Sequence, residues 1–210
     1  PHNLILQSQT FDNASWTKTQ CSISANAVTA PDGTVTADKL VENTATANHE
    51  VAAAASSKVA GATYTLSVYA KSAGRDHVRM LFHSIAFGGY IGSFFNLSTG
   101  VAGTPEAGVT VAIEDAGDDW YRCSITATAT ATASAAEFIR PDDNGAGGPY
   151  TGDGTSGIYV WGAQLEQNPS VSSYVATTTA AAYGPRKHVV YAGDQYPDMN
   201  LLLQSNGFDT

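Results

Sequence analysis

Aromatic, arginine and histidine side chains alternate with apolar residues along several stretches of this 210-residue sequence. In an extended strand, residues two apart share one face, so the polar members of each stretch fall opposite the apolar ones. The polar set consists of Tyr69, Arg79, His83, Arg122 and Arg140. Flat rings that stack on apolar faces, beside groups that hydrogen-bond hydroxyls, are what sugar binding requires. We expect these five residues to line one polar sheet face; ordinary solvent-facing side chains are the alternative.

Four further residues are candidates for the same chemistry. Tyr90 follows a Gly-Gly pair, and Trp161 lies in the last apolar stretch. Asp142 and Tyr150 lie in the polar loop 140–157, which reads "RPDDNGAGGPYTGDGTSG". Each aromatic residue could equally be buried. The loop could wrap a calcium ion through aspartates and backbone carbonyls, or it could be a solvated surface loop.

No pattern of catalytic residues is present. The chain has no Gly-x-Ser-x-Gly motif, its five histidines lack zinc-ligand spacing, and "GGYIGS" lacks the lysine of a phosphate-binding loop. Glycoside hydrolysis needs two carboxylates about 5–9 Å apart. The acidic candidates lie mostly in Gly-rich turns, where turn geometry alone favours Asp; they are Asp115, Asp118, Asp119, Glu137, Asp142, Asp143 and Asp153. We therefore expect a protein that is not an enzyme.

The charge of the chain argues against two classes of partner. The formal net charge is −9, and the ten Lys and Arg residues form no basic stripe, so a nucleic-acid partner is excluded. An acidic membrane surface is disfavoured for the same reason, and no run of about 18 apolar residues could span a bilayer. Cys21 and Cys123 could pair, but a chain of this length does not need the bond, and we expect two free, buried thiols.

Period-2 patterns rich in Val, Ile, Thr and Tyr dominate the sequence, and helical periodicity is nearly absent. We expect strands at 21–30, 63–71, 77–84, 90–97, 109–115, 120–133, 135–140 and 157–166. Turn signals such as "APDGT" and "DAGDD" separate them. The run "WYRCSITATATATA" at 120–133 is interpreted as one long strand. The pattern predicts an all-β fold, a two-sheet antiparallel β-sandwich.

The end of the chain repeats its beginning. Residues 200–210 read "NLLLQSNGFDT" and residues 3–13 read "NLILQSQTFDN", with seven of eleven positions identical. We interpret 1–180 as one module, 181–199 as a linker, and 200–210 as the truncated first strand of a following tandem copy. Chance similarity of two strands within one domain is the alternative.

Four phrases carry a family resemblance. In order they are "NLILQSQTFDNASW", "YTLSVYAKS", "DWYRCSITATATA" and "GIYVWGAQLE". Together they resemble the jelly-roll carbohydrate-binding modules attached to xylanases and cellulases, in the variant found in phage tail and virion-associated proteins. The resemblance covers roughly residues 3–178.

The resemblance implies a jelly roll that binds a polysaccharide or cell-surface glycan without cleaving it, in a groove on one sheet or in loops at one end. It also implies an extracellular or virion-associated parent protein. Many relatives hold a structural calcium, for which Asp12 and Asp38 are the candidate ligands here. The aspartate that the last strand of relatives contributes is replaced by Trp161 or Gly162. The alternative function is a structural domain of a virion fibre or tail that binds no sugar.

Overall fold

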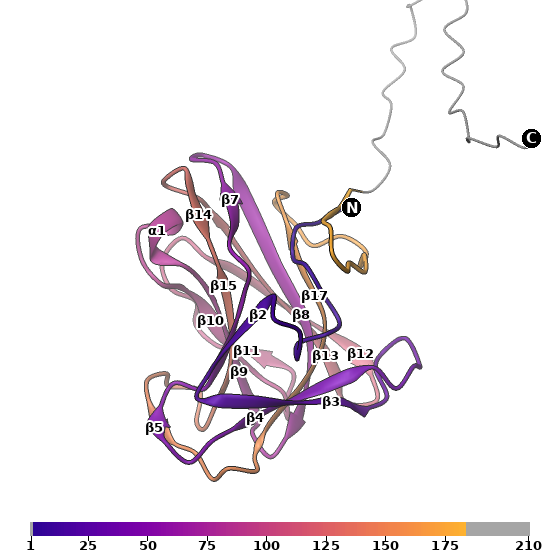
Figure 1. The fold of residues 1–210 in the computed structure, drawn as a ribbon. Coiled ribbons are helices and arrows are strands. Elements are labelled where there is room, and N and C mark those ends of the chain that lie inside the picture. Colours follow the sequence, from indigo (N-terminus) through magenta and orange to yellow (C-terminus); the bar gives the residue numbers. More distant parts are fainter. Residues whose placement is uncertain (1, 184–210) are drawn as a thin grey trace, which may run out of the picture.

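The computed structural model describes residues 2–183, which form many antiparallel strands and one short helix, α1, at Ser84–Phe87 (Figure 1). The strands are β1 (His2–Asn3), β2 (Trp16–Thr19), β3 (Cys21–Val28), β4 (Ala37–Glu42), β5 (Thr46–Ala47), β6 (Glu50–Ala53), β7 (Ser56–Lys58), β8 (Thr63–Ala73), β9 (His77–Phe82), β10 (Ile91–Asn96), β11 (Val101–Ala102), β12 (Thr110–Gly117), β13 (Trp120–Thr128), β14 (Ala133–Ala135), β15 (Glu137–Asp142), β16 (Tyr150–Thr151), β17 (Gly157–Glu166) and β18 (Ala182–Tyr183). The repeated phrase 200–210 and most of the expected linker lie outside the described residues.

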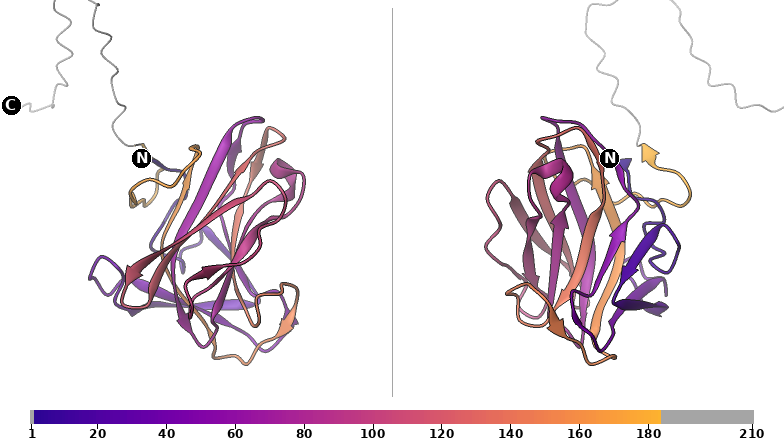
Figure 2. Two further views of the ribbon diagram at one scale, coloured as in Figure 1. Left: turned by 180° about the vertical axis from the view of Figure 1, so that it is seen from behind. Right: turned by 60° about the vertical axis from the view of Figure 1, so that its left-hand side comes forward.

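Two six-stranded sheets make up the body of the domain (Figures 1 and 2). The first sheet has the order β11-β10-β9-β15-β6-β2, and the second has the order β12-β13-β8-β17-β4-β3. Every strand pair in both sheets is antiparallel. The predicted two-sheet antiparallel β-sandwich is therefore confirmed. Among residues 2–183, the structure has no helix long and apolar enough to cross a membrane.

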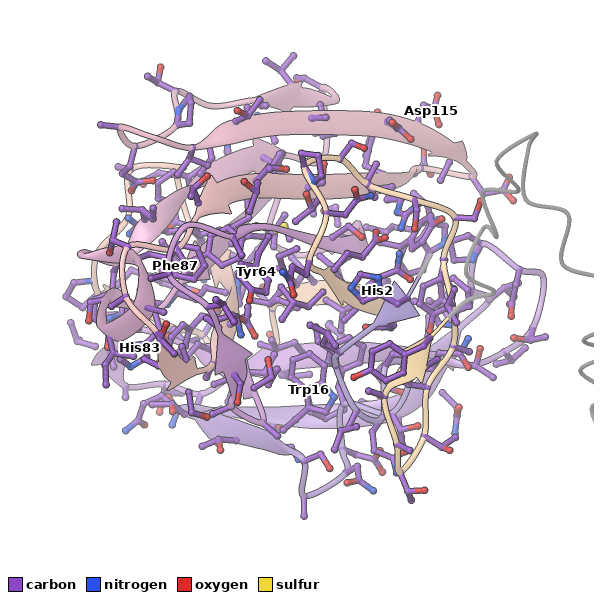
Figure 3. The ribbon with its side chains drawn as sticks, turned by 90° about the horizontal axis from the view of Figure 1, so that it is seen from above. His2, Trp16, Tyr64, His83, Phe87 and Asp115 are labelled. Carbon is purple, nitrogen blue, oxygen red and sulfur yellow. The ribbon has the colours of Figure 1, made fainter. Side chains whose placement is uncertain are left out.

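The core lies between the inner faces of the two sheets. Leu66 and Val68 in β8, and Val78, Met80 and Phe82 in β9, are each fully buried there. These are the apolar positions that alternation predicts for both strands. Tyr64 and Phe87 extend the core beside α1, with their rings edge to face and their centroids 6.2 Å apart (Figure 3).

A β-bulge in β17 keeps its apolar residues in the core. The register against β8 runs from Trp161 opposite Tyr69 to Gln164 opposite Ser67, so β17 carries one extra residue. Gly162 lies in the bulge with φ 61°, a left-handed conformation that favours glycine. Without the bulge, the second half of the strand would turn its apolar side chains outward.

Two expectations about the strands are wrong. The predicted polar residues do not share one face: Arg79 and Arg140 belong to the first sheet, His83 follows β9 as the N-cap of α1, and Tyr69 and Arg122 belong to the second sheet. In addition, 120–133 is not one strand. Strand β13 ends at Thr128, and the chain turns before β14, which pairs with β7 instead.

The start of the chain lies beside the last described residues (Figure 1). Strand β1 pairs with β18, with His2 opposite Tyr183 and Asn3 opposite Ala182. The long closing segment from β17 to β18 carries Tyr174 and Thr177, which hydrogen-bond Ser8 near the N-terminus. The two ends therefore hold one another against the second sheet.

Candidate functional site

A groove of about 380 Å³ opens on the outer face of the first sheet. Its lining comes from the ends of β9 and β10, from β11 and its flanks, and from the loop after β15. The lining residues are His77, Phe94, Asn96, Thr99, Val101, Ala102, Gly103, Asn144 and Gly145. These residues combine the flat ring of Phe94 and small apolar surfaces with amide, imidazole and hydroxyl groups. They contain no carboxylate, so general acid–base chemistry by two carboxylates has no support within the groove.

Strand register places the groove residues in rows across β15, β9 and β10. Arg140 lies opposite Arg79, which lies opposite Phe94. In the next row, Asp142 lies opposite His77, which lies opposite Asn96. Because every second residue of a strand shares a face, both rows project outward while Val78 and Met80 project into the core.

Arg79 and Phe94 form the centre of this face. The Arg79 guanidinium lies over the Phe94 ring, 4.7 Å from its centroid. Arg79 Nη2 donates to Glu106 Oε1 at 2.7 Å, and the backbone N–H of Gly92 donates to Glu106 Oε2 at 2.8 Å. These contacts fix the ring and the guanidinium before any ligand arrives. Arg79 Nε is buried and has no hydrogen-bond partner among the described residues.

His77 is held in one tautomer by Asn96. The Asn96 Oδ1 atom accepts hydrogen bonds from the backbone N–H groups of Ser98 and Thr99, which orients the amide. Asn96 Nδ2 therefore donates to His77 Nε2 at 3.1 Å, and the proton of the neutral imidazole must lie on Nδ1. His77 Nδ1 is buried and has no partner within residues 2–183. It is a donor without an acceptor.

A glycine-rich loop between β15 and β16 lies directly against these side chains. A Cβ atom on Gly145 would come within 2.9 Å of the His77 ring. A Cβ on Gly147 would come within 2.6 Å of Arg79 Nη1 and 2.8 Å of the Phe94 ring. Both glycines have positive φ, 73° and 75°. The loop therefore approaches the centre of the face with bare backbone, which no other residue type allows.

A buried carboxylate anchors the far end of this loop. Glu42 accepts hydrogen bonds from the Tyr150 hydroxyl at 2.6 Å, from Arg75 Nε at 2.9 Å and from the Asp153 backbone N–H at 2.8 Å. Burial alone raises the pKa of Glu42, but the hydrogen bonds from Arg75, Tyr150 and Asp153 outweigh it and lower the pKa below its usual value. Tyr150, predicted as a sugar contact, is buried in this anchor.

An aromatic group adjoins the face beyond the arginine row. The rings of His83 and Tyr90 are tilted against one another with centroids 4.9 Å apart, and each centroid lies 5.7 Å from that of Phe138. Of the two alternatives left open for Tyr90, exposure and burial, the structure shows a half-exposed side chain. Arg140 lies over Phe138, 5.7 Å from the ring centroid, and its Nε donates to Glu50. Figure 3 shows His83 at the end of the sandwich that carries α1.

Three predicted site residues, Tyr69, Arg122 and Trp161, lie on the second sheet, where a later segment of the chain packs over them. The segment after β17 crosses the outer face of the second sheet, and Arg122 Nη1 donates to the Ser172 carbonyl at 2.8 Å. Tyr174 lies over Trp161, with ring centroids 4.8 Å apart, and meets Tyr69 edge to face. Arg122 and Trp161 are buried. The expectation that Trp161 could lie exposed on a sheet face is wrong, because this segment covers it.

Asp142 shapes the glycine loop. It is buried, and its Oδ1 accepts hydrogen bonds from the backbone N–H groups of Asn144 and Gly145. This is the turn-forming role common for aspartate. The carboxylate therefore holds the groove wall in place from behind.

Asp12 and Asp38, the candidate calcium ligands, lie near one another. Asp38 is buried, and each of its oxygens accepts a backbone hydrogen bond, from Phe11 at 2.8 Å and from Asn26 at 2.9 Å. Asp12 is exposed. Within residues 2–183, no group of three or more His, Cys, Asp or Glu is arranged to hold a metal. Calcium binding stays a prediction.

Sequence reasoning missed Phe94, His77, Asn96 and Asn144 as groove residues. The alternation in 90–97 contains the signal for two of them, since Phe94 and Asn96 share a face. What the sequence does not contain is the pairing of β9 with both β10 and β15, which brings these residues beside Arg79 and Arg140.

Comparison with known proteins yields little. No family model matches the chain. No curated protein matches it. One similar solved structure is that of the CBM22-1–GH10 modules of the N-terminal endo-1,4-β-D-xylanase 10B of Clostridium thermocellum, complexed with xylohexaose. The identity is 15% and the TM-score 0.43; the match covers 84% of this chain and 29% of that one. We draw nothing about function from a likeness of this degree.

Proposed function

We propose that this domain is a non-catalytic carbohydrate-binding module whose binding site is the groove on the first sheet. The observation that carries the proposal is the immobilised Phe94 ring, set among donors and acceptors from His77, Asn96 and Asn144. Sugar rings present C–H groups on one face and hydroxyls at their edges, and this groove offers a partner to each.

Preorganisation supports the proposal. Arg79, paired with Glu106, lies over the Phe94 ring, Asn96 fixes His77, and the glycine loop closes one wall. The free-energy cost of ordering these side chains on ligand binding should therefore be small.

The test is a binding titration of the full chain with a panel of soluble polysaccharides, together with pull-down on insoluble ones. Phe94→Ala should weaken binding roughly tenfold or more, because a loss of about 1.4 kcal/mol is tenfold in affinity. Phe94→Tyr keeps the flat ring and should retain most of the binding. Tyr183→Ala removes an exposed tyrosine on β18, outside the groove, and is the matched control.

A second variant separates the groove from the neighbouring aromatic group. Tyr90→Ala leaves the groove lining intact, and we expect it to bind almost as well as the unmodified chain. Loss of binding in Tyr90→Ala but not in Phe94→Ala would move the site to the aromatic group. Addition of a chelator should leave binding unchanged; a loss would revive the calcium prediction.

The wider setting is proposed from the sequence. The phrase resemblance and the repeat at 200–210 support an extracellular or virion-associated parent protein that carries tandem copies of this module. Tandem weak sites would gain affinity through effective concentration. If the folded chain binds no polysaccharide on a broad panel, the proposal fails and a structural role in a virion fibre or tail becomes the better account.

A further inference from the structure

The opening segment 3–13, which we call the strap, is held by buried polar contacts. Asn3 is fully buried and uses its whole hydrogen-bonding capacity. Its Nδ2 donates to the carbonyls of Ala163 and Val175, both at 2.9 Å. Its Oδ1 accepts from the backbone N–H groups of Ile5 and Leu165. No other side chain offers two donors and an acceptor at this size, so the position requires asparagine.

Ser8 and Phe11 complete the strap contacts. Ser8 is buried; its Oγ lies 2.6 Å from the Tyr174 hydroxyl and accepts from the backbone N–H of Thr177 at 2.9 Å. Phe11 is buried against Trp16, with ring centroids 4.4 Å apart. The strap seat therefore consists of β17, the segment 174–178 and the surroundings of Trp16.

The phrase at 200–210 repeats the side chains that the seat recognises. Four strap residues are buried, namely Asn3, Ile5, Ser8 and Phe11. Their counterparts are Asn200, Leu202, Ser205 and Phe208, three identical and one a conservative apolar change. Apart from Ile5, the positions that differ, Gln9, Thr10 and Asn13, are not buried in the strap. Leu4, Leu6, Gln7 and Asp12 are not buried and are also repeated, so the repeat preserves most of the strap as well as its buried contacts.

We propose that the strap seat accepts residues 200–210 as a second strap, in exchange with residues 3–13. The chain leaves the described domain at Tyr183, which pairs with His2, directly beside the seat. The sixteen residues 184–199 can extend at most about 55 Å, enough to bring Asn200 to the seat of its own domain or of a neighbouring copy. The occupant is thus residues 200–210, whichever copy supplies them.

A double-mutant cycle on the full chain tests the exchange. Asn3→Ala should lower the thermal midpoint, because it leaves buried partners of the seat unsatisfied. In that background, Asn200→Ala should lower the midpoint further, by roughly 2–4 °C or more, whereas alone it should change little. Asn206→Ala, which alters a tail asparagine whose counterpart Gln9 is not buried, is the matched control. No effect of Asn200→Ala in either background would overturn the proposal.

A cross-link provides direct detection. The counterpart of Asn206 is Gln9, which follows Ser8, the hydrogen-bond partner of the Tyr174 hydroxyl. A photo-reactive residue at position 206 should therefore cross-link to 172–178 in the Asn3→Ala chain, and Asn200→Ala should remove the product. If Asn3→Ala does not fold, Leu4→Ala weakens the half-buried part of the strap instead. Isotope-mixed chains distinguish exchange within a copy from exchange between copies, and cross-links elsewhere or none would overturn the proposal.

Discussion

Lys58 and Glu137 form a buried ion pair that should contribute strongly to stability. Lys58 Nζ lies 2.8 Å from Glu137 Oε1, and neither side chain is more than 1% exposed. Lys58 also donates to the carbonyl of Ala135 and to Ser56 Oγ, whereas Glu137 Oε2 has no partner among the described residues. Burial raises the pKa of Glu137, and the charge of Lys58 opposes that shift.

Lys58→Met should destabilise the domain by about 3–5 kcal/mol, because it leaves an uncompensated buried carboxylate. The double variant Lys58→Met/Glu137→Leu should recover most of this loss, since an apolar pair needs no compensation. Urea denaturation of both variants measures the difference. Equal instability of the single and double variants would mean that packing, and not charge, sets the cost.

The lowered pKa of Glu42 predicts how the stability of the domain depends on pH. Its folded-state pKa lies below the ordinary value of 4.5, so its charged form is favoured in the folded protein. The stability it contributes is present above about pH 4.5 and is lost as the pH falls through the lowered folded-state pKa. Glu42→Gln should therefore be less stable than the unmodified chain at neutral pH, and the gap should shrink below pH 4.5.

Denaturation curves at several pH values check this. Glu114→Gln, which removes an exposed carboxylate of β12, is the control. A gap between Glu42→Gln and the unmodified chain that stays constant down to pH 3 would contradict the assignment of Glu42 as a charged anchor for the glycine loop.

At the scale of elements, the glycine loop decides whether the groove is open. Gly147→Ala would place a Cβ against both Arg79 and Phe94, at a φ of 75° that costs an alanine about 1–2 kcal/mol. We expect reduced stability together with loss of polysaccharide binding. Gly148→Ala also has positive φ, 104°, but its Cβ would meet nothing within 4 Å. It should lose stability and keep its binding, as titration and urea denaturation would show.

Alternation predicted the faces of the strands but neither their ends nor their partners. The inward positions of β8, β9 and β13 follow the period of two, so Leu66, Met80 and Ile125 are core residues as expected. The threonine–alanine run after Trp120 has small residues on both faces and therefore carries no information about where its strand ends. Just after the end of β13, the backbone N–H groups of Thr130 and Ala131 donate to the Ala86 carbonyl, and the chain leaves the second sheet.

At the scale of the molecule, sheet order is what sequence reasoning could not supply. Strand β9 lies between β10 and β15, while β8 lies between β13 and β17, so pairs form between strands far apart in the chain. Arg79 and Arg122 each face outward as predicted, yet they do so from opposite sides of the sandwich. None of the nine predicted site residues lines the groove, although Arg79 contacts its Phe94 ring and Asp142 holds the backbone of Gly145. The cover formed by 167–178 was missed because it has no periodic pattern.

The two thiols allow the cooperativity of the whole sandwich to be measured. Cys21 and Cys123 are both free. Burial raises the pKa of Cys21 to about 11, and Cys123 is fully buried in the core between the sheets. Because both sheets share that core, we expect Cys123 to become reactive only when the domain unfolds as a unit.

In a Cys21→Ser chain, thiol labelling as a function of urea should then give the same midpoint as circular dichroism, and a reductant should leave the midpoint unchanged. Labelling of Cys123 well below that midpoint would mean that the second sheet opens while the first remains folded. In that case the groove on the first sheet would be carried by an independently stable half of the molecule, and polysaccharide binding should persist at urea concentrations that already expose Cys123.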